Sequence, residues 1–158
     1  ASVTAPEIKA KCRRLASSPK GLALVVIDYL QLVTTGGRVE SRQVEVSEIS
    51  RAFKTMAMEL KVPVIALAQL SRNAERRESN QPRLADLRES GSIEQDADLV
   101  LFLNRQDYFE TKTAENKNNI VPVDVIIAKH RRGSTGLFQV LFELNKSCFK
   151  AYSPLEEM

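Results

Sequence analysis

The feature that most constrains this chain is an unbroken apolar run that ends on a single carboxylate. The run Leu22–Ile27 has the sequence Leu-Ala-Leu-Val-Val-Ile, and Asp28 follows it directly. A short run rich in Val, Ile and Leu, preceded by Gly21, predicts a buried strand of a parallel sheet. Burying an ionised Asp at the end of such a strand is costly unless a cation or a hydrogen-bond donor meets it.

Two interpretations of Asp28 follow from this position. In open α/β sheets ligands bind at the carboxyl ends of the strands. Asp28 can therefore be a Walker B carboxylate, which holds Mg²⁺ together with water and phosphate oxygens. It can equally turn the chain or cap the next segment, and the run alone does not decide between the two.

Length and composition set the outer bounds. A chain of 158 residues with 43% hydrophobic and 27% charged residues suits one soluble domain with a real core. No apolar run reaches the length of a membrane span and the first residues are not a signal peptide, so we expect a cytoplasmic protein without a membrane partner. The net charge of +3 does not by itself indicate nucleic-acid binding. With one His and the distant thiols Cys12 and Cys148, we expect free cysteines and no structural metal site.

The first half of the chain predicts a strand–helix–strand unit. Thr4 and Glu7 form a capping box with Pro6 in the first turn of a helix; its apolar face is made by Ile8, Cys12 and Leu15. The longest helix is expected from Ser41 to Lys61, with an apolar stripe of Val46, Ile49, Phe53, Met56 and Leu60. Val62–Ala68 predicts a second buried strand, which ends on Gln69. Two such strands joined by a helix place their polar ends at one edge of a sheet.

The second half is more polar. Residues 71–83 contain four arginines and predict a mobile loop. Short helical turns are expected at 84–91 and 92–95, and strands at 98–103, 123–128, 137–144 and 148–152. The last three strands are expected to be antiparallel and to lie against one edge of the parallel part. Residues 105–119 predict an exposed excursion, and Lys129–Gly136 a tight connection whose glycines permit positive φ.

Four blocks of residues follow one another along the chain in a recognisable order. The blocks are Val-Val-Ile-Asp28-Tyr-Leu-Gln-Leu, Ile-Ala-Leu-Ala-Gln69-Leu-Ser-Arg72, Asp86-Leu-Arg88-Glu89-Ser-Gly91-Ser-Ile-Glu-Gln-Asp-Ala-Asp98, and Ala-Lys129-His-Arg131-Arg-Gly-Ser-Thr-Gly136. Such an ordered set is far more specific than any single motif. Together the blocks resemble the DnaB family of bacterial replicative helicases.

The resemblance implies a fold, a reaction and partners. The fold would be α/β and RecA-like, with a mainly parallel sheet flanked by helices and an antiparallel C-terminal hairpin. The activity would be ATP hydrolysis with Mg²⁺ in a homo-hexameric ring that moves along single-stranded DNA and unwinds duplex. Primase and a helicase loader would be further partners.

The resemblance also assigns nucleotide roles to matching positions. Asp28 would be the Walker B carboxylate that holds Mg²⁺ through water, and Gln69 the phosphate sensor. Lys129 and Arg131 would form an arginine-finger pair that reaches the nucleotide of the neighbouring subunit. Simpler roles stay open: Gln69 as a polar residue that caps a turn, and the two cations as part of a solvated hairpin turn. His130 receives no catalytic role.

The DNA contacts implied by the family lie in the arginine-rich loop and in the block that follows it. Arginines and main-chain amides contact phosphates without selecting bases, which suits a motor that accepts any sequence. For Arg76 and Arg77, pairing with Glu75 and Glu78 is an equally good interpretation. The candidate DNA-binding residues are Arg72, Arg76, Arg77, Arg83, Arg88, Glu89 and Gly91.

Two parts of a complete motor have no counterpart in these residues. The sequence contains no Gly-x-x-x-x-Gly-Lys-Ser/Thr loop, and no position matches the family's catalytic glutamate. We therefore expect residues 1–158 to be the C-terminal part of a RecA-like motor domain, truncated at its N-terminal side and catalytically incompetent alone. Two alternatives remain: another RecA-like DNA-dependent ATPase (a recombinase or a RadA-type repair protein), and a non-catalytic module that binds single-stranded DNA or a partner.

Overall fold

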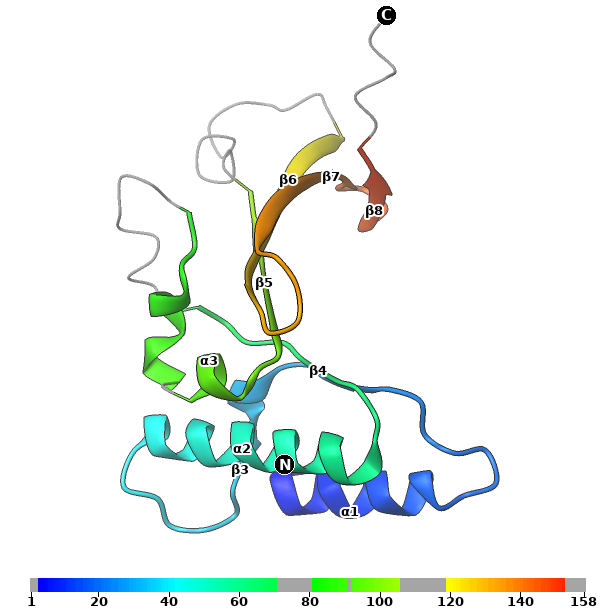
Figure 1. Cartoon of the computed structure of the whole chain (residues 1–158), viewed down its shortest axis with the longest axis vertical. Coiled ribbons are helices and arrows are strands. Elements are labelled where there is room, and N and C mark those ends of the chain that lie inside the picture. Colours follow the sequence, from blue (N-terminus) through cyan, green and yellow to red (C-terminus); the bar gives the residue numbers. More distant parts are fainter. Residues whose placement is uncertain (1–2, 71–80, 91, 106–118, 153–158) are drawn as a thin grey trace, which may run out of the picture. The chain divides into compact units, whose positions relative to one another are not determined.

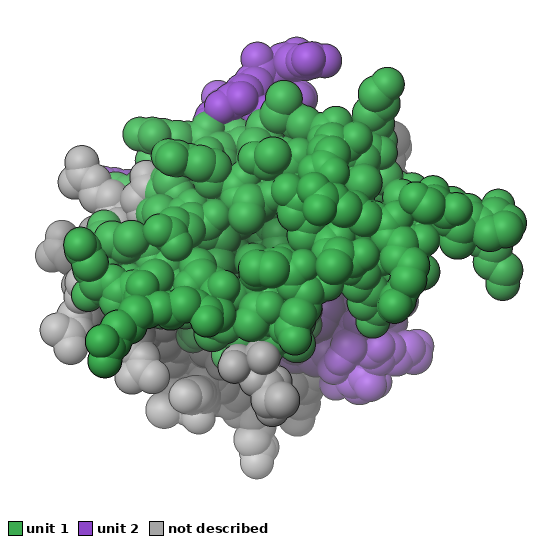
Figure 2. All heavy atoms as spheres, turned by 90° about the horizontal axis from the view of Figure 1, so that it is seen from below, with its two compact units in different colours: residues 1–73, 84–97 green, residues 74–83, 98–158 purple. Residues whose placement is uncertain are grey.

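The structure is a computed structural model that describes residues 3–70, 81–90, 92–105 and 119–152. The chain divides into two compact units, coloured separately in Figure 2. Unit 1 comprises Ala1–Asn73 and Leu84–Ala97, and unit 2 comprises Ala74–Arg83 and Asp98–Met158.

Unit 1 opens with strand β1 (Val3–Thr4) and helix α1 (Ala5–Ala16). The predicted capping box is confirmed: Thr4 Oγ1 accepts from the Glu7 amide at 3.3 Å, and the Glu7 carboxylate accepts from the Thr4 amide at 2.9 Å. Cys12 is buried on the apolar face, whereas Leu15 is 41% exposed. Only part of the predicted apolar face of α1 is therefore buried in the described structure.

The two short strands predicted around the long helix are present and parallel. Strand β2 (Val25–Ile27) pairs with β4 (Val64–Ala66), with Val25 opposite Val64 and Ile27 opposite Ala66. Val26 and Ile65 are 57% and 52% exposed, so the prediction that these strands are buried is wrong at these two positions. Successive side chains of a strand point to opposite faces, and within the described part only the face with Val25 and Ile27 is covered.

Helix α2 (Arg42–Leu60) connects β2 to β4 and provides the core of unit 1. Ser41 caps it by accepting from the Val44 amide at 3.2 Å, and Lys61 ends it in the left-handed conformation with φ of 54°. The predicted stripe is confirmed, because Val46, Ile49, Phe53 and Met56 are buried and Leu60 is half-buried. Figure 1 shows α1 running alongside α2.

The segment between β2 and α2 is more ordered than the predicted loop. After Asp28 the chain forms a 3₁₀ turn, η1 (Leu30–Leu32), and a two-residue strand, β3 (Val33–Thr34). Strand β3 pairs in parallel with β1, which the sequence did not indicate. Gly36 has φ of +81°, and a Cβ at this position would lie 3.2 Å from Thr4 Cγ2.

The two predicted short helical turns are confirmed and are anchored to α2. They are η3 (Leu84–Ser90) and α3 (Ile93–Asp96). The Ser92 hydroxyl donates to the Ser47 carbonyl at 3.2 Å, and the Ser50 hydroxyl donates to Asp96 Oδ2 at 2.8 Å. Leu87 and Ile93 are buried, so α2 holds this segment through both apolar and polar contacts.

Unit 2 is built on an antiparallel sheet in the order β5-β6-β7-β8. Its strands are β5 (Leu99–Asn104), β6 (Ile120–His130), β7 (Gly136–Glu143) and β8 (Cys148–Ala151). The predicted antiparallel strands are confirmed, but β6 is longer than expected at both ends and includes Lys129 and His130. Most of the predicted arginine-rich loop (71–83), at 71–80, and most of the predicted polar excursion (105–119), at 106–118, lie outside the described residues.

The glycines of the β6–β7 turn serve a different purpose from the predicted one. Neither Gly133 nor Gly136 has a positive φ. A Cβ on Gly133 would instead lie 2.4 Å from the ring of His130. The turn needs glycine at this position because the imidazole packs against the main chain.

The cysteines are free, as predicted. Cys12 is buried and Cys148 is exposed. Burial raises the pKa of the Cys12 thiol, which keeps it protonated. Within the described ranges, no helix has both the length and the apolar character that crossing a bilayer requires.

We predict that acid weakens the contact between α1 and α2. Arg13 donates to both oxygens of Glu59, at 2.7 and 3.0 Å, and Lys9 lies 3.3 Å from the same carboxylate. These contacts, with Arg13 the largest cause, lower the pKa of Glu59 from 4.5 to about 2. A folded-state pKa below the unfolded value gives stability that is present above about pH 4.5 and lost as pH falls towards about 2.

The measurement is the Tm of the native chain and of Glu59→Gln as a function of pH. The Tm of the native chain should exceed that of Glu59→Gln by a modest amount, because the paired groups are exposed. This difference in Tm should shrink as the pH falls. Glu48→Gln is the matched control, since it removes a carboxylate from the same helix without touching these contacts. A gap between native and Glu59→Gln that stays constant down to about pH 2 would contradict the prediction.

Candidate functional site

Asp28 and Gln69 lie at the same end of the β2–β4 pair. Asp28 directly follows Ile27, and Gln69 comes three residues after Ala66, the register partner of Ile27. Parallel strands in register bring their carboxyl ends together. Both side chains are exposed, so a carboxylate and an amide are open to ligand at one sheet edge.

The hydrogen-bond ladder continues beyond the last paired residues. The Leu67 amide donates to the Ile27 carbonyl at 2.9 Å, and the Leu30 amide donates to the Leu67 carbonyl at 2.8 Å. Beyond Leu67 the side chain of Gln31, rather than main-chain groups, forms the hydrogen bonds to this segment. Its Nε2 donates to the Gln69 carbonyl at 3.0 Å, and its Oε1 accepts from the Gln69 amide at 3.3 Å.

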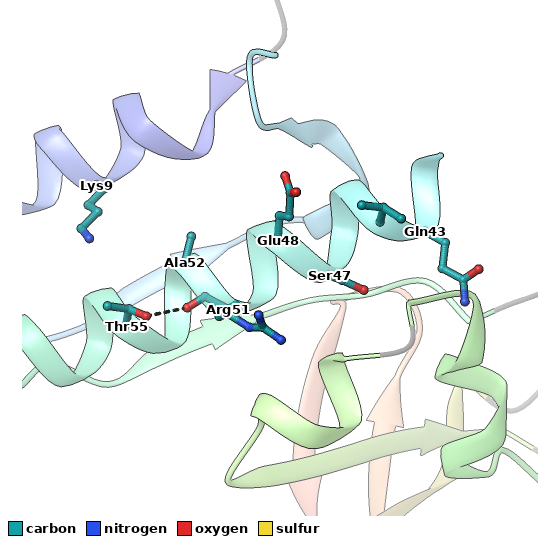
Figure 3. A pocket seen from close by; sticks show the side chains of 8 residues that line it. Lys9, Gln43, Ser47, Glu48, Arg51, Ala52 and Thr55 are labelled. Atoms are coloured by element: carbon teal, nitrogen blue, oxygen red, sulfur yellow. Dashed lines mark hydrogen bonds between the residues drawn. The ribbon is translucent and has the colours of Figure 1, made fainter. Parts of the chain in front are cut away.

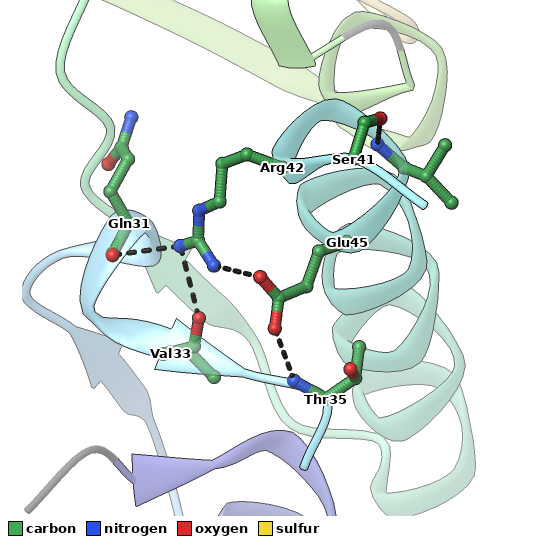
Figure 4. A network of polar contacts seen from close by, with 7 residues as sticks. Gln31, Val33, Thr35, Ser41, Arg42 and Glu45 are labelled. Carbon is green, nitrogen blue, oxygen red and sulfur yellow. Dashed lines mark hydrogen bonds and ion pairs between the residues drawn. The ribbon is translucent and has the colours of Figure 1, made fainter. Parts of the chain in front are cut away.

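The first turn of α2 supports the segment that carries Gln31 (Figure 4). Arg42 Nη2 donates to the carbonyls of Gln31, at 2.8 Å, and Val33, at 3.1 Å. Arg42 also pairs with Glu45, whose other oxygen accepts from the Thr35 amide at 3.0 Å. The Thr35 amide, and after it Arg42, lower the pKa of the buried Glu45 carboxyl and keep it ionised.

The donor set suits a magnesium ion that is shared with a nucleotide. Mg²⁺ is usually held by one or two carboxylates, with water and phosphate oxygens completing its shell. Asp28 is one accessible carboxylate, and the described residues contain no cluster of three or more His, Cys, Asp or Glu that could cage a metal. One exposed carboxylate is compatible with a Mg²⁺ ion that takes its other ligands from water and phosphate oxygens.

Lys129 and Arg131 lie together at the end of β6 in unit 2. Lys129 is the register partner of Val100 and is half-buried, and Arg131 is exposed. The Arg131 amide donates to the Asp98 carbonyl at 2.8 Å, and its guanidinium lies 3.3 Å from the Asp98 carboxylate. Asp98 thus contacts both the main chain and the side chain of Arg131. Lys129 lies in the part of β6 next to the turn, and Arg131 directly follows the strand.

The predicted DNA-binding residues are described only in part. Arg88 and Glu89 belong to η3, which lies in contact with α2. Arg83 is exposed and directly precedes η3. The other four candidates lie outside the described residues: Arg72, Arg76, Arg77 and Gly91.

A hollow of about 680 Å³ lies between α1 and α2 and includes none of the predicted residues (Figure 3). Several polar groups in its wall already have partners. Lys9 pairs with Glu59, and the Thr55 hydroxyl donates to the Arg51 carbonyl at 2.9 Å. We assign it no ligand. The lining residues are Lys9, Gln43, Val44, Ser47, Glu48, Arg51, Ala52 and Thr55.

Comparison with protein families decides the wider relationship. The model of the DnaB-like helicase C-terminal domain matches residues 1–151. The chain belongs to this family. The predicted resemblance is therefore confirmed over nearly the whole chain, and with it the RecA-like α/β fold.

Similar proteins include replicative helicases of several bacteria. The chain is 55% identical over 148 residues to the replicative DNA helicase DnaB of Geobacillus stearothermophilus, covering 92% of the chain and 32% of that protein. It is 52% identical over 154 residues to DnaB of Leifsonia xyli, covering 98% of the chain and 33% of that protein. The chain thus spans about a third of the length of these relatives.

Solved structures agree with the sequence relationship. An ATPase domain superposes with a TM-score of 0.84 at 45% identity, covering 96% of the chain and 52% of that domain. A DnaB-like replicative helicase, studied with its interactions with primase, superposes with a TM-score of 0.77 at 48% identity. In that case 89% of the chain and 34% of the helicase are covered.

Four residues that contribute to the site were not assigned from the sequence. Gln31 and Asp98 stand within the blocks that carry the family resemblance, but no role was given to either. A polar side chain between two leucines was the available signal for Gln31. The Arg42–Glu45 pair has the i, i+3 spacing of helical ion pairs, and its contacts with the η1–β3 segment follow only from the fold.

We predict that Asp98→Asn loosens the guanidinium of Arg131 with little loss of stability. The two side chains are 64% and 47% exposed, and exposed pairs contribute about 0–1 kcal/mol. The free energy of unfolding in urea should therefore change by about 1 kcal/mol or less. ¹⁵N relaxation at Arg131 Nε should report faster motion, with Nε of the neighbouring Arg132 as the control. Unchanged relaxation at Arg131 would show that Asp98 does not restrain it.

Proposed function

We propose that this chain is the C-terminal part of the motor of an ATP-dependent replicative DNA helicase. The observation that carries the proposal is the in-register pairing of β2 and β4, which brings Asp28 and Gln69 to one sheet edge. Membership of the DnaB-like helicase family and high identity to bacterial replicative helicases support it. A cytoplasmic location belongs to the same proposal.

In this proposal Asp28 orients Mg²⁺ through bound water, and ATP with Mg²⁺ supplies the phosphoryl chemistry. Gln69 donates a hydrogen bond from its neutral amide to a γ-phosphate oxygen, or orients the attacking water. The amide loses this contact once phosphate departs. Gln69 stands at the root of the arginine-rich segment, so the change in contact is transmitted towards DNA.

The remaining residues act between subunits and on DNA. Lys129 and Arg131 reach the nucleotide of the next subunit in a homo-hexamer, where the planar, permanently charged Arg stabilises developing charge. Phosphates of single-stranded DNA contact Arg88 and main-chain amides near Glu89 and Gly91, together with arginines of the preceding segment. Primase and a helicase loader are proposed partners. A solved relative studied with primase supports the first of them.

Two other functions make different predictions. A recombinase or RadA-type repair protein would hydrolyse ATP on DNA without unwinding a forked duplex. A non-catalytic module would bind DNA and hydrolyse nothing, and the lack of a phosphate-loop motif in these 158 residues favours that behaviour for the chain alone. We expect no ATP turnover from the chain alone, and DNA-stimulated turnover and fork unwinding from the full-length protein.

A subunit-mixing experiment tests the nucleotide site. In the full-length protein, Arg131→Ala should lower DNA-stimulated ATP hydrolysis by about 10³-fold or more, the range known for arginine fingers. Asp28→Asn should also lower it, because the proposed magnesium carboxylate is lost. Hexamers mixed from the two variants should recover part of the activity, because some interfaces then pair an intact Asp28 with an intact Arg131.

The control for this experiment is Arg132→Ala, which removes the neighbouring arginine of the same turn and should leave hydrolysis near the native level. Failure of the mixed hexamers to recover activity, despite normal assembly, would show that Arg131 does not act across an interface. Normal hydrolysis by Asp28→Asn would rule out its role as the magnesium carboxylate.

The DNA interface is tested by the salt dependence of binding. Phosphate contacts make the affinity for single-stranded DNA fall steeply with salt. Arg88→Ala in the full-length protein should weaken binding to all sequences alike and lower the slope of log K against log salt by about 1. Lys20→Ala is the control, since Lys20 is exposed and distant in sequence from the predicted contacts. Binding that is insensitive to salt would overturn the assignment.

A further inference from the structure

The contact between Gln31 and Gln69 has no counterpart among the roles proposed above. The amide nitrogen and the amide oxygen of Gln31 both bond to the same residue: Nε2 donates to the carbonyl of Gln69 at 3.0 Å, and Oε1 accepts from its amide at 3.3 Å. The two residues are 38 positions apart in the sequence. A primary amide can imitate a strand neighbour in this way because it carries the same donor and acceptor groups as a peptide.

The fold explains why a side chain takes this place. The β2–β4 ladder ends at Ile27 and Ala66, and the last main-chain bond across it joins Leu30 to Leu67. The chain then turns into η1, so its main chain no longer runs along the segment that carries Gln69. Gln31, the middle residue of η1, reaches back and completes the ladder.

The position of Gln31 is itself fixed from α2. Arg42 donates to the Gln31 carbonyl at 2.8 Å, and Glu45 holds Arg42 by an ion pair (Figure 4). Glu45 also accepts at 3.0 Å from the amide of Thr35, the residue that directly follows β3. The contacts form a continuous series from α2, through Arg42 and Gln31, to the main chain of Gln69.

We propose that Gln31 is a positioning residue that sets the main chain of Gln69 for its contact with phosphate. This inference rests on the proposed sensor role of Gln69. Gln31 touches neither nucleotide nor Mg²⁺ in this proposal. It fixes the residue that does, and it joins the segment after Asp28 to the segment after β4 so that both move as one body.

The first test is the rate of DNA-stimulated ATP hydrolysis by the full-length protein with Gln31→Met, which keeps the length of the side chain and removes both hydrogen bonds. A misplaced contact group costs up to about 10²-fold in rate, so we expect kcat to fall about 10- to 100-fold while KM for ATP stays within about twofold. Gln43→Met is the control, since it makes the same replacement on α2, in the wall of the hollow in Figure 3.

A second variant separates positioning from folding. In Gln31→Glu, an ionised carboxylate can accept from the Gln69 amide but repels its carbonyl, whereas the protonated form can donate to it. We expect kcat of Gln31→Glu, relative to native protein at the same pH, to rise as the pH is lowered. The ratio of the kcat of Gln31→Met to the kcat of native protein should not change with pH. A flat profile for Gln31→Glu would overturn the proposal.

A double-mutant cycle shows whether Gln31 acts through Gln69. If it does, Gln31→Met lowers kcat in native protein but has no further effect in Gln69→Ala. An equal loss in both backgrounds would overturn the proposal. If Gln69→Ala leaves kcat at the native level, the sensor role of Gln69 fails and this inference fails with it. If Gln69→Ala lowers kcat while Gln31→Met leaves kcat at the native level, only the positioning role of Gln31 is wrong.

Discussion

The candidate site depends on the parallel pairing of two three-residue strands. The register between β2 and β4 decides which residues emerge at their carboxyl ends, and a shift by one residue would turn every side chain to the opposite face. In the observed register Asp28 and Gln69 emerge together, with main-chain bonds from Leu67 to Ile27 and from Leu30 to Leu67 continuing the pairing past the strands. So short a ladder is weak alone, and the surrounding contacts must hold it.

Helix α2 supplies much of that support in unit 1. Its apolar stripe forms the core with Ile49 and Met56 fully buried, and its first turn holds the η1–β3 segment through Arg42 and Glu45. Its middle turns anchor α3 through the carbonyl of Ser47, which accepts from Ser92, and the hydroxyl of Ser50, which donates to Asp96. Helix α2 also contacts η3. One helix therefore fixes both the segment proposed to face nucleotide and the segment proposed to face DNA.

Features set by local sequence could be predicted, whereas most of those set by long-range contacts could not. The capping box at Thr4 and the stripe of α2 need only neighbours within a few residues, and both were confirmed. Strand β3 has two residues and no detectable period, and it exists only because β1 pairs with it. The exposure of Val26 and Ile65 was missed because apolar composition does not report which side of a sheet is covered.

The site residues divide in the same way. Asp28 and Gln69 were placed at one edge by family pattern and strand order. The role of Gln31 was missed because its contact with Gln69 spans 38 residues and can be found only once the strand register is known.

The contact from Gln31 fixes the main chain at position 69 independently of the side chain that this position carries. Both hydrogen bonds go to main-chain atoms, which nineteen of the twenty amino acids supply in the same form, whatever side chain they carry. Proline is the exception, because it has no amide hydrogen to donate to Oε1. The side chain at position 69 is thus free to vary over evolution or in the laboratory without loss of its placement. A related protein that used a different group for the same contact could keep the surrounding scaffold unchanged.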